Sequence, residues 1–269
     1  MPRRKVIRPA SPSLTKLAVT CTHCGLRELC FPAGLSGPDM QRLEQRVSRH
    51  VSVPQGAHLY SRGDAFEAIY AVRTGFLKTC ASLENGREHV SGFQMAGELL
   101  GFDGLGLGVH TQDAVALEDS KVCVMAYGPL EKLARELPQL QRHLHQAMGR
   151  EIVRNHAVML LLSSMRAEVR IAAFLLNLAK RLETRGFSGA NLLLRMTREE
   201  IGTHLGLTVE TVSRCFSKFA ELGTLHVRSR EVQIVDAAAL ERLVKAVSIS
   251  AAAGGAAHEV ARCEVCAPS

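Results

Sequence analysis

The stretch that decides the fold lies in the last third of the chain and reads Met196-Thr-Arg-Glu-Glu-Ile-Gly-Thr-His-Leu-Gly-Leu-Thr-Val-Glu-Thr-Val-Ser-Arg-Cys-Phe-Ser-Lys-Phe219. Thr197 and Glu200 have the spacing of a capping box, which predicts that a short helix begins there. Gly206 then marks a sharp turn, and Thr208 can cap a second helix. A short helix, a glycine-containing turn and a second helix together predict a helix-turn-helix.

The second helix of this pair is predicted to carry a polar face suited to DNA. Its period places Val209, Val212 and Phe216 toward the interior. The residues that then face outward together are Glu210, Ser213, Arg214 and Ser217. Arginine can bind guanine through two hydrogen bonds, glutamate can accept one from cytosine, and serine can bond to bases or phosphates. The face favours DNA recognition over the alternative of an ordinary solvated helix pair.

The segment after the helix pair supports this interpretation. It predicts two short strands around a basic turn and reads Leu225-His-Val-Arg-Ser-Arg-Glu-Val-Gln-Ile-Val235. In a winged helix-turn-helix such a hairpin is the wing, and Arg228 and Arg230 could lie on DNA phosphates. A charged surface hairpin without a DNA contact is the alternative.

The composition is that of an ordinary protein with two domains. A chain of 269 residues can form two hydrophobic cores, and 46% of the residues are apolar and 22% charged. We expect no membrane helix, because no apolar run reaches about 18 residues, and no secretory signal. Eight cysteines without an export signal favour the reducing cytoplasm. The net charge of +7 is a mild indication of a polyanionic partner.

A cluster of three cysteines near the start indicates a metal centre. Cys21, Cys24 and Cys30 follow the spacing C-x2-C-x5-C. Thiolates select zinc or iron–sulfur clusters, and both kinds of centre usually need four protein ligands. The pattern by itself leaves the fourth ligand and the choice of metal open.

Residues 51–127 predict a small antiparallel β-roll or barrel, because short strand-like runs alternate with turns. Asn85-Gly86 lies between alternating apolar residues and predicts a hairpin. The region has no Ser/His/Asp set, paired carboxylates or phosphate-binding loop, so we interpret it as a scaffold or sensor domain rather than a catalytic barrel. Before it, Ser36 is a plausible cap for a short helix.

Residues 129–165 predict helices, with Pro129 and Pro138 each in a first helical turn. The longer helix has an apolar seven-residue stripe with polar interruptions, which is typical of a dimerising helix. The predicted dimer interface comprises Leu144, Met148, Glu151, Ile152, Asn155, Val158, Leu162 and Met165. The alternative is a helix packed on its own domain, but Arg150 and Arg154 beside the stripe would be unwelcome in a monomeric core.

The order of these parts resembles the CRP/FNR superfamily of transcription regulators, and within it the oxygen-responsive FNR type. The similarity rests on Thr197-Arg-Glu-Glu-Ile-Gly202 and Leu205-Gly-Leu-Thr-Val-Glu-Thr-Val-Ser-Arg214 and extends over about residues 20–245. It implies an α+β chain with an N-terminal β-roll (a cyclic-nucleotide-binding-like jelly roll), a long dimerisation helix and a C-terminal winged helix-turn-helix. It also implies that Glu210, Ser213 and Arg214 contact a TTGAT-type half-site in an inverted repeat. Thr208, Arg228 and Arg230 are the other expected DNA-binding residues.

The expected organisation has five parts. These are a tail with the cysteine cluster (1–30), the β-roll sensor domain (31–137), the dimerisation helix (138–166), the winged helix-turn-helix (167–247) and a low-complexity tail (248–269). The tail carries Cys263-Glu-Val-Cys266, which could bind metal, be redox-active or have no role. The resemblance does not explain this pair.

The resemblance further implies a [4Fe–4S] cluster, one in each subunit. Cys123 matches the distant fourth ligand of the FNR-type cluster, and Cys21, Cys24 and Cys30 match the other three. Leu29 matches a residue that screens the cluster from oxygen. The implied function is an oxygen- or redox-responsive homodimer that regulates anaerobic or microaerobic genes. Zinc or a dithiol switch is the nearer alternative, and an iron–sulfur electron-transfer protein is the more distant one.

No cyclic nucleotide is expected as a ligand. Gly97-Glu98 resembles part of the phosphate cassette of the superfamily, but the following loop, residues 105–113, has no arginine to neutralise a cyclic phosphate.

RNA polymerase is the expected protein partner. The residues that resemble polymerase-facing surfaces of the family are Glu84, Asn85, Gly86, Arg87 and Asp119. One departure concerns the dimer: the family commonly has an acidic residue at the position of Asn155, and its repulsion opposes dimerisation until the cluster forms. Because asparagine does not repel, we expect this dimer to depend less steeply on the cluster.

Overall fold

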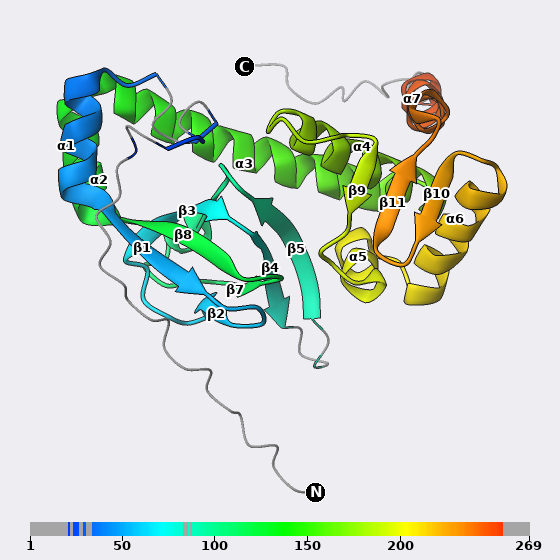
Figure 1. The fold of residues 1–269 in the computed structure, drawn as a ribbon, viewed down its shortest axis with the longest axis horizontal. Coiled ribbons are helices and arrows are strands. Elements are labelled where there is room, and N and C mark those ends of the chain that lie inside the picture. Colours follow the sequence, from blue (N-terminus) through cyan, green and yellow to red (C-terminus); the bar gives the residue numbers. More distant parts are fainter. Residues whose placement is uncertain are drawn as a thin grey trace, which may run out of the picture. The chain divides into compact units, whose positions relative to one another are not determined.

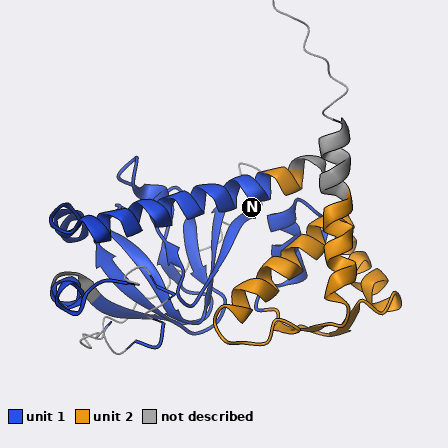
Figure 2. Ribbon diagram, turned by 90° about the horizontal axis from the view of Figure 1, so that it is seen from above, with its two compact units in different colours: residues 1–159, 195–209 blue, residues 160–194, 210–269 orange. Residues whose placement is uncertain are grey.

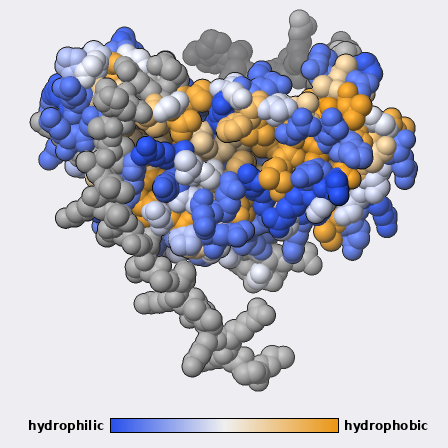
Figure 3. Space-filling view, viewed as in Figure 1, coloured by the Kyte–Doolittle hydropathy of each residue, from blue (hydrophilic) through white to orange (hydrophobic). Residues whose placement is uncertain are grey.

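The computed structural model describes residues 21, 24–26, 29–30, 34–82, 86 and 88–254 (Figure 1). The chain divides into two compact units, and each is described by itself (Figure 2). The first unit contains residues 1–159 and 195–209, and the second contains residues 160–194 and 210–269. Hydrophobic and hydrophilic residues are interspersed on the face shown in Figure 3. Within the described part of the chain, no helix has the length and apolar character needed to cross a membrane.

The first unit is built on two four-stranded antiparallel sheets, as the strand pattern predicts. One sheet has the order β1(Ser48–Val53), β8(Ser120–Ala126), β3(Ala68–Thr74), β6(Leu99–Leu100). The other has the order β2(His58–Tyr60), β7(Asp113–Ala116), β4(Phe76–Ser82), β5(Glu88–Met95). Val51, Leu77 and Val122 belong to one buried cluster supplied by both sheets. This arrangement confirms the predicted roll.

Two connections in the roll show why the sequence has glycine there. Ser82 pairs with Glu88 in the β4–β5 ladder, which confirms the hairpin predicted from Asn85-Gly86. Gly75, between β3 and β4, has a φ of 94°. A Cβ at position 75 would lie 2.2 Å from the Ser120 Oγ atom, so a larger residue does not fit.

Helices flank the roll at both ends of its sequence. Helix α1 (Gly37–Val47) follows Ser36, whose Oγ atom accepts a hydrogen bond from the Asp39 N–H, as expected of its cap. Helix α2 (Tyr127–Glu136) has Pro129 in its first turn, and α3 (Pro138–Ser164) begins at Pro138. The buried residues that join these helices to the roll are Met40, Leu43, Ile69, Leu130, Leu133 and Leu140.

Helix α5 (Arg198–Leu205) also belongs to the first unit. The Thr197 hydroxyl accepts from the Glu200 N–H, and the Glu200 carboxylate accepts from the Thr197 N–H. The predicted capping box is therefore confirmed. The helix ends at Gly206, which has a left-handed φ of 62°.

The second unit contains the remaining helices and a small sheet. Its elements are α4(Ala167–Glu183), β9(Asn191–Leu193), α6(Val209–Glu221), β10(Leu225–Arg228), β11(Glu231–Ile234) and α7(Ala237–Gly254). The three strands have the order β10–β11–β9.

The low-complexity tail predicted from residue 248 is wrong for its first part, because α7 continues to Gly254. Alanine is the strongest helix former, so the run at 251–253 extends the helix, and the glycine pair that follows favours its end. Cys263 and Cys266 lie outside the described residues.

Candidate DNA-binding surface and cysteine site

Helix α6 separates a buried face from an exposed polar one. Its buried residues are Val212, Cys215, Phe216 and Phe219, which agrees with the predicted apolar face at Val212 and Phe216. The residues predicted to face outward, Glu210, Ser213, Arg214 and Ser217, are all exposed. Val209 was predicted to face inward, but it is 45% exposed. It is the first residue of the helix, immediately after the exposed Thr208, where little of the helix surface is covered.

The predicted wing is a two-stranded hairpin with an exposed basic turn. Arg228 pairs with Glu231 at the end of the β10–β11 ladder, which leaves Ser229 and Arg230 as the turn. Ser229 has a φ of 57°, as tight hairpin turns require. Arg228 and Arg230 are both exposed and can therefore reach a phosphate backbone.

Helix α5 is anchored on the β-roll by polar contacts that the sequence analysis missed. The Lys78 ammonium on β4 lies 3.0 Å from a Glu200 carboxylate oxygen and forms a second ion pair with Glu88 on β5. The His204 Nδ1 atom lies 3.1 Å from the Val90 carbonyl oxygen. No local pattern could have indicated these pairs, because the partners of α5 are more than a hundred residues away in the sequence.

Burial and hydrogen bonding shift the pKa values of Lys78 and Glu200 in opposite directions. Burial by itself lowers the pKa of Lys78, but its hydrogen bonds to Glu88 and Glu200 outweigh that effect and hold the pKa above its usual value. Burial by itself raises the pKa of Glu200, but the hydrogen bonds from Thr197 and Lys78 hold it below its usual value. Both groups are therefore charged at neutral pH.

The structure brings the cysteine segment to the face of β8 that carries Cys123. Val122 and Val124 point into the core of the roll, so the strand alternation turns Cys123 to the other face. There Cys21, Cys30 and Cys123 pack against the same hydrophobic cluster. Burial raises the pKa of Cys123 to about 12, and the neighbouring thiols of Cys21 and Cys24 add to the rise.

Backbone hydrogen bonds shape the cysteine segment internally, and Leu29 contacts the roll. The Cys24 N–H donates to the Cys21 carbonyl, and the Cys30 N–H donates to the Leu26 carbonyl. Leu29 lies over Gly97, where an added Cβ would come within 3.2 Å of the Leu29 Cβ. The turn between β5 and β6 therefore supports the segment at Leu29.

The four thiols are chemically suited to a cluster. None of the four forms a disulfide, and Cys21, Cys30 and Cys123, from two separate segments, pack against one apolar patch. Among the described residues, no three His, Cys, Asp or Glu side chains are arranged to hold a single metal ion. An iron–sulfur cluster spreads its thiolates over different irons and does not need that arrangement. Cys80 is buried in β4, where burial raises its pKa to about 12.

Helix α3 places the predicted interface residues in different environments. Leu144 is buried in the protein's own core, so its assignment to the dimer interface is wrong for the described subunit. Met148, Glu151, Val158, Leu162 and Met165 are half-buried, and Asn155 is exposed. The exposed apolar residues along this helix are Ile152, Val153, Met159 and Leu160, of which only Ile152 was predicted.

The physical reason is that the start of α3 covers the roll. Its apolar stripe there packs on α1 and α2 residues within the subunit, and the exposed stripe begins only at Ile152. The spacing of Ile152 and Met159, seven residues, could have indicated this second stripe.

The predicted polymerase-facing residues are only partly described. Glu84, Asn85 and Arg87 lie outside the described residues, and Gly86 is exposed. Asp119 is exposed, and its carboxylate accepts a hydrogen bond of 2.9 Å from the Gln55 N–H.

Comparison with known proteins identifies both domains. A cyclic nucleotide-binding domain matches residues 50–136, and a Crp-like helix-turn-helix domain matches residues 169–243. The transcriptional regulatory protein btr of Bordetella pertussis is 41% identical over 236 residues, which cover 88% of this chain and 96% of that protein. The transcriptional activator protein Anr of Pseudomonas protegens is 43% identical over 216 residues, which cover 80% of this chain and 88% of that protein.

Two further relatives extend the comparison. The fumarate and nitrate reduction regulatory protein of Escherichia coli is 37% identical over 243 residues, which cover 90% of this chain and 96% of that protein. The solved structure of FixK2 from Bradyrhizobium japonicum matches with a TM-score of 0.68 and 31% identity, over 73% of this chain and 97% of that one. These relatives are named as regulators rather than enzymes, and the chain belongs to the CRP/FNR family of DNA-binding transcription regulators.

Proposed function

We propose that this protein is an oxygen- or redox-responsive regulator that binds an inverted-repeat operator as a homodimer. The observation that carries the proposal is the convergence of the Cys21–Cys30 segment on Cys123, within a chain that belongs to this family. Relatives named for fumarate and nitrate reduction support a role in genes used when oxygen is scarce. RNA polymerase is the partner that activation would require.

Cys21, Cys24, Cys30 and Cys123 are the residues that would hold a [4Fe–4S] cluster. When bound, such a cluster supplies oxygen-sensitive bonds between the N-terminal segment and the roll. The four thiols bind as thiolates, so they release protons when they become ligands. Leu29 lies over Gly97 and is 40% exposed, and we propose it as the residue that shields the cluster from oxygen.

Helix α3 would transmit the state of this site to the dimer. It begins within the cluster of buried residues that Cys30 and Cys123 also contact, and it carries the exposed apolar stripe farther along. A partner helix that covered Ile152, Val153, Met159 and Leu160 would remove apolar surface from water, which favours association. A change at the thiol end could then shift the monomer–dimer equilibrium.

Helix α6 is the proposed reading element. Arg214 and Glu210 can bond to base edges in the major groove, Ser213 to bases or phosphates, and Arg228 and Arg230 to the backbone. Because each subunit has one such helix, tight binding needs both half-sites, and modest dimer weakening strongly reduces occupancy.

The test is anaerobic purification with iron and sulfide analysis, a visible spectrum before and after air, and operator binding in both conditions. We expect four irons and four sulfides per subunit, on the basis of the cluster type, and weaker DNA binding after air. Cys123→Ala should lose the iron, whereas the matched control Cys80→Ala should retain it. A colourless zinc protein that binds DNA equally in air would refute the oxygen-responsive function. Air-sensitive DNA binding without iron would instead favour a dithiol switch.

Asn155 is the residue at which this dimer is expected to depart from its relatives. Sedimentation of the apo and cluster-bound forms should find part of the apo protein dimeric, because an exposed amide does not repel its counterpart. Asn155→Asp should make the apo form monomeric at the same concentration. A wholly monomeric wild-type apo form at about micromolar concentration would contradict this expectation.

A further inference from the structure

One sheet of the β-roll brings two basic side chains to the face that carries Cys123. The sheet has the order β1–β8–β3, so β8, which carries Cys123, lies between the other two strands (Figure 1). His50 on β1 is the direct register partner of Cys123. Because Val51 belongs to the core of the roll, strand alternation turns His50 to the opposite face, which is the face of Cys123. Directly opposed Cβ atoms of neighbouring strands lie about 5 Å apart, so His50 flanks the Cys123 thiol.

Arg73 reaches the same face from the other side of β8. In the β3–β8 ladder, the residues before and after Arg73 pair with two successive residues of β8, so Arg73 is an extra residue without a register partner. A β-bulge of this kind re-aims a side chain and is common next to functional sites. The Arg73 Nη1 atom lies 3.2 Å from Nδ1 and 3.1 Å from Nε2 of His50. To reach His50 from β3, the Arg73 side chain must cross β8 on the face of Cys123.

The contact with His50 holds the Arg73 guanidinium in place. Its Nη1 atom is nearly equidistant from the two ring nitrogens. This position lies over the face of the imidazole, because the C–H group between the nitrogens blocks an approach in the ring plane. An imidazole carries no negative charge, so it supports the guanidinium without neutralising it.

Arg73 is a cation without a carboxylate partner in the part of the chain that the structure describes. Its side chain is half-buried, and its hydrogen-bond contacts are those with His50. A charge that is partly removed from water is stabilised by an opposite charge. Burial raises the pKa of Cys123, and the Arg73 charge opposes this rise. The Arg73 charge therefore acts on the Cys123 sulfur.

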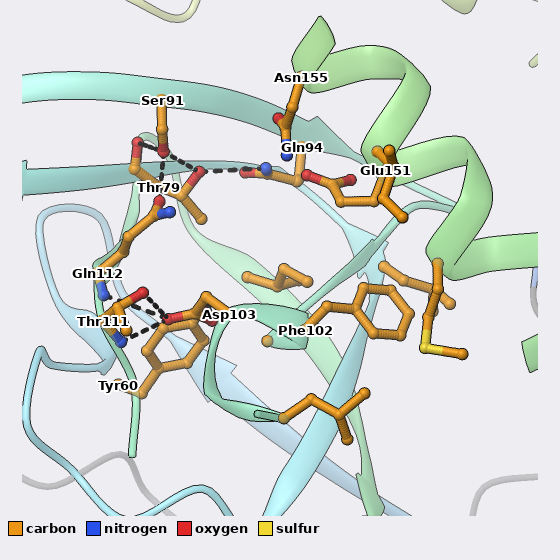
Figure 4. Close-up of a pocket in the computed structure, with 16 residues that line it drawn as sticks. Tyr60, Thr79, Ser91, Gln94, Phe102, Asp103, Thr111, Gln112, Glu151 and Asn155 are labelled. Atoms are coloured by element: carbon orange, nitrogen blue, oxygen red, sulfur yellow. Dashed lines mark hydrogen bonds between the residues drawn. The ribbon is translucent and has the colours of Figure 1, made fainter. Parts of the chain in front are cut away.

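A cation at this position matches the charge of a thiolate-bound cluster. Four thiolates carry more negative charge than the positive charge of a [4Fe–4S] core, so the bound group is an anion. Nearby charges and hydrogen bonds to the sulfurs tune such a group, and a guanidinium can supply both. Neither Arg73 nor His50 lines the cavity of about 410 Å³ shown in Figure 4, so their site is a different one.

We propose that Arg73 is a positioning residue of the cysteine site, whose guanidinium, held over His50, places a fixed positive charge beside the Cys123 sulfur and stabilises the anionic group that forms there. Arginine stays charged throughout the working range of pH, so this effect does not depend on a proton. The consequence for the cluster rests on the proposed function, whereas the charge at Cys123 does not.

Alkylation of Cys123 in the iron-free, full-length protein tests the charge directly. The probes are iodoacetate, which is anionic, and iodoacetamide, which is neutral, and peptide mass spectrometry follows Cys123. Both probes react with the thiolate, so the ratio of their rates is independent of the amount of thiolate and reports the local potential. Arg73→Gln should lower the ratio of iodoacetate to iodoacetamide rates about threefold or more, as expected of one unit charge at a partly solvated site. Arg73→Lys, which retains the charge, should lower it less.

Arg49→Gln is the matched control. Arg49 precedes His50 on β1, so strand alternation turns it to the other face of the sheet, where it is exposed. Its replacement removes the same charge and should leave the alkylation ratio as in wild type. In the anaerobically purified, iron-loaded protein, Arg73→Gln should release iron to a chelator about threefold faster or more, whereas Arg49→Gln should not.

His50→Ala keeps the proposal testable if Arg73→Gln does not fold. It retains the guanidinium but removes the ring that holds it, so the alkylation ratio should fall by a smaller factor. The proposal is overturned if folded Arg73→Gln, or His50→Ala in its place, leaves the ratio unchanged. It is equally overturned if Arg73→Lys or Arg49→Gln lowers the ratio as much as Arg73→Gln, or if iron release is unchanged. A wild-type protein that binds no iron would refute the proposed function, whereas an unchanged ratio refutes the role of Arg73 whether or not iron is bound.

Discussion

Lys78→Met removes the cation that holds helix α5 on the β-roll, and we expect it to destabilise the protein strongly. Lys78 is 9% exposed and lies between two carboxylates. Methionine fills a similar volume but leaves the largely buried Glu200 carboxylate without its cation. Removing one partner of a buried ion pair costs about 3–5 kcal/mol. Because the Glu88 side chain is 45% exposed and can be solvated, we expect a loss near the lower end, about 3 kcal/mol.

The loss of stability caused by Lys78→Met should depend on pH, and the pKa shifts of Glu200 and Lys78 give its direction. The pKa of Glu200 is lower in the folded protein than its usual 4.5. The stability it contributes is therefore present above 4.5 and is lost as the pH falls through the lower folded value. The pKa of Lys78 is raised above 10.5, so its contribution is present below 10.5 and is lost as the pH rises through the higher folded value. The difference in the free energy of unfolding between wild type and Lys78→Met should be largest at about pH 7 and should decrease in strong acid.

Urea unfolding under anaerobic conditions, followed by circular dichroism, measures this difference. Lys245→Met is the matched control, because Lys245 forms an ion pair of 3.1 Å with Glu241 on an exposed helix face. Such a surface pair contributes about 0–1 kcal/mol. Lys78→Met should also cost less in a Glu200→Gln background, where the amide can still accept from the Thr197 N–H. The reasoning fails if Lys78→Met costs no more than Lys245→Met, or if its cost is the same in both backgrounds.

Three further perturbations test other parts of the structure. Gly75→Ala should destabilise the protein by more than about 3 kcal/mol in urea unfolding, because its Cβ would clash with Ser120. The left-handed backbone at this position adds about 1–2 kcal/mol. Gly56→Ala is the control, because it carries the same backbone cost but has no neighbour within 4 Å. Arg214→Ala should weaken operator binding by about 1–3 kcal/mol and relax one base preference, measured by titration of base-substituted operators. Gly97→Ala should shorten the lifetime of the iron chromophore in air, because its Cβ crowds Leu29, whereas Gly56→Ala should not.

Local sequence signals predicted the helix-turn-helix well because its start, turn and face are set by neighbouring residues. The capping box at Thr197 needs only Glu200, and the exposed face of α6 follows from the helical period. The β4–β5 hairpin was predictable for the same reason, since its turn lies between the paired strands. The fourth cysteine was a different case. Nothing around Cys123 distinguishes it from Cys80, and only the family resemblance selected it.

Signals that depend on tertiary partners were missed or misplaced. The apolar stripe of α3 was correctly recognised as a stripe, but Leu144 serves the subunit core, and a second stripe is exposed from Ile152 onward. A seven-residue apolar pattern alone does not show whether each segment of a long helix packs on its own subunit or on a second subunit. The ion pair between Lys78 and Glu200 had no local indication, since a lysine on a strand is ordinarily a solvated residue.

The loop at residues 105–113 shows what an absence in a sequence can and cannot predict. The lack of an arginine there indicated that no cyclic phosphate is held. It did not indicate which group satisfies the loop's N–H donors, which must be bonded if they are buried. The structure supplies Asp103, a carboxylate that accepts from two successive N–H groups of that loop. The Asp103 carboxylate therefore occupies the N–H donors that an anion bound at this loop would need.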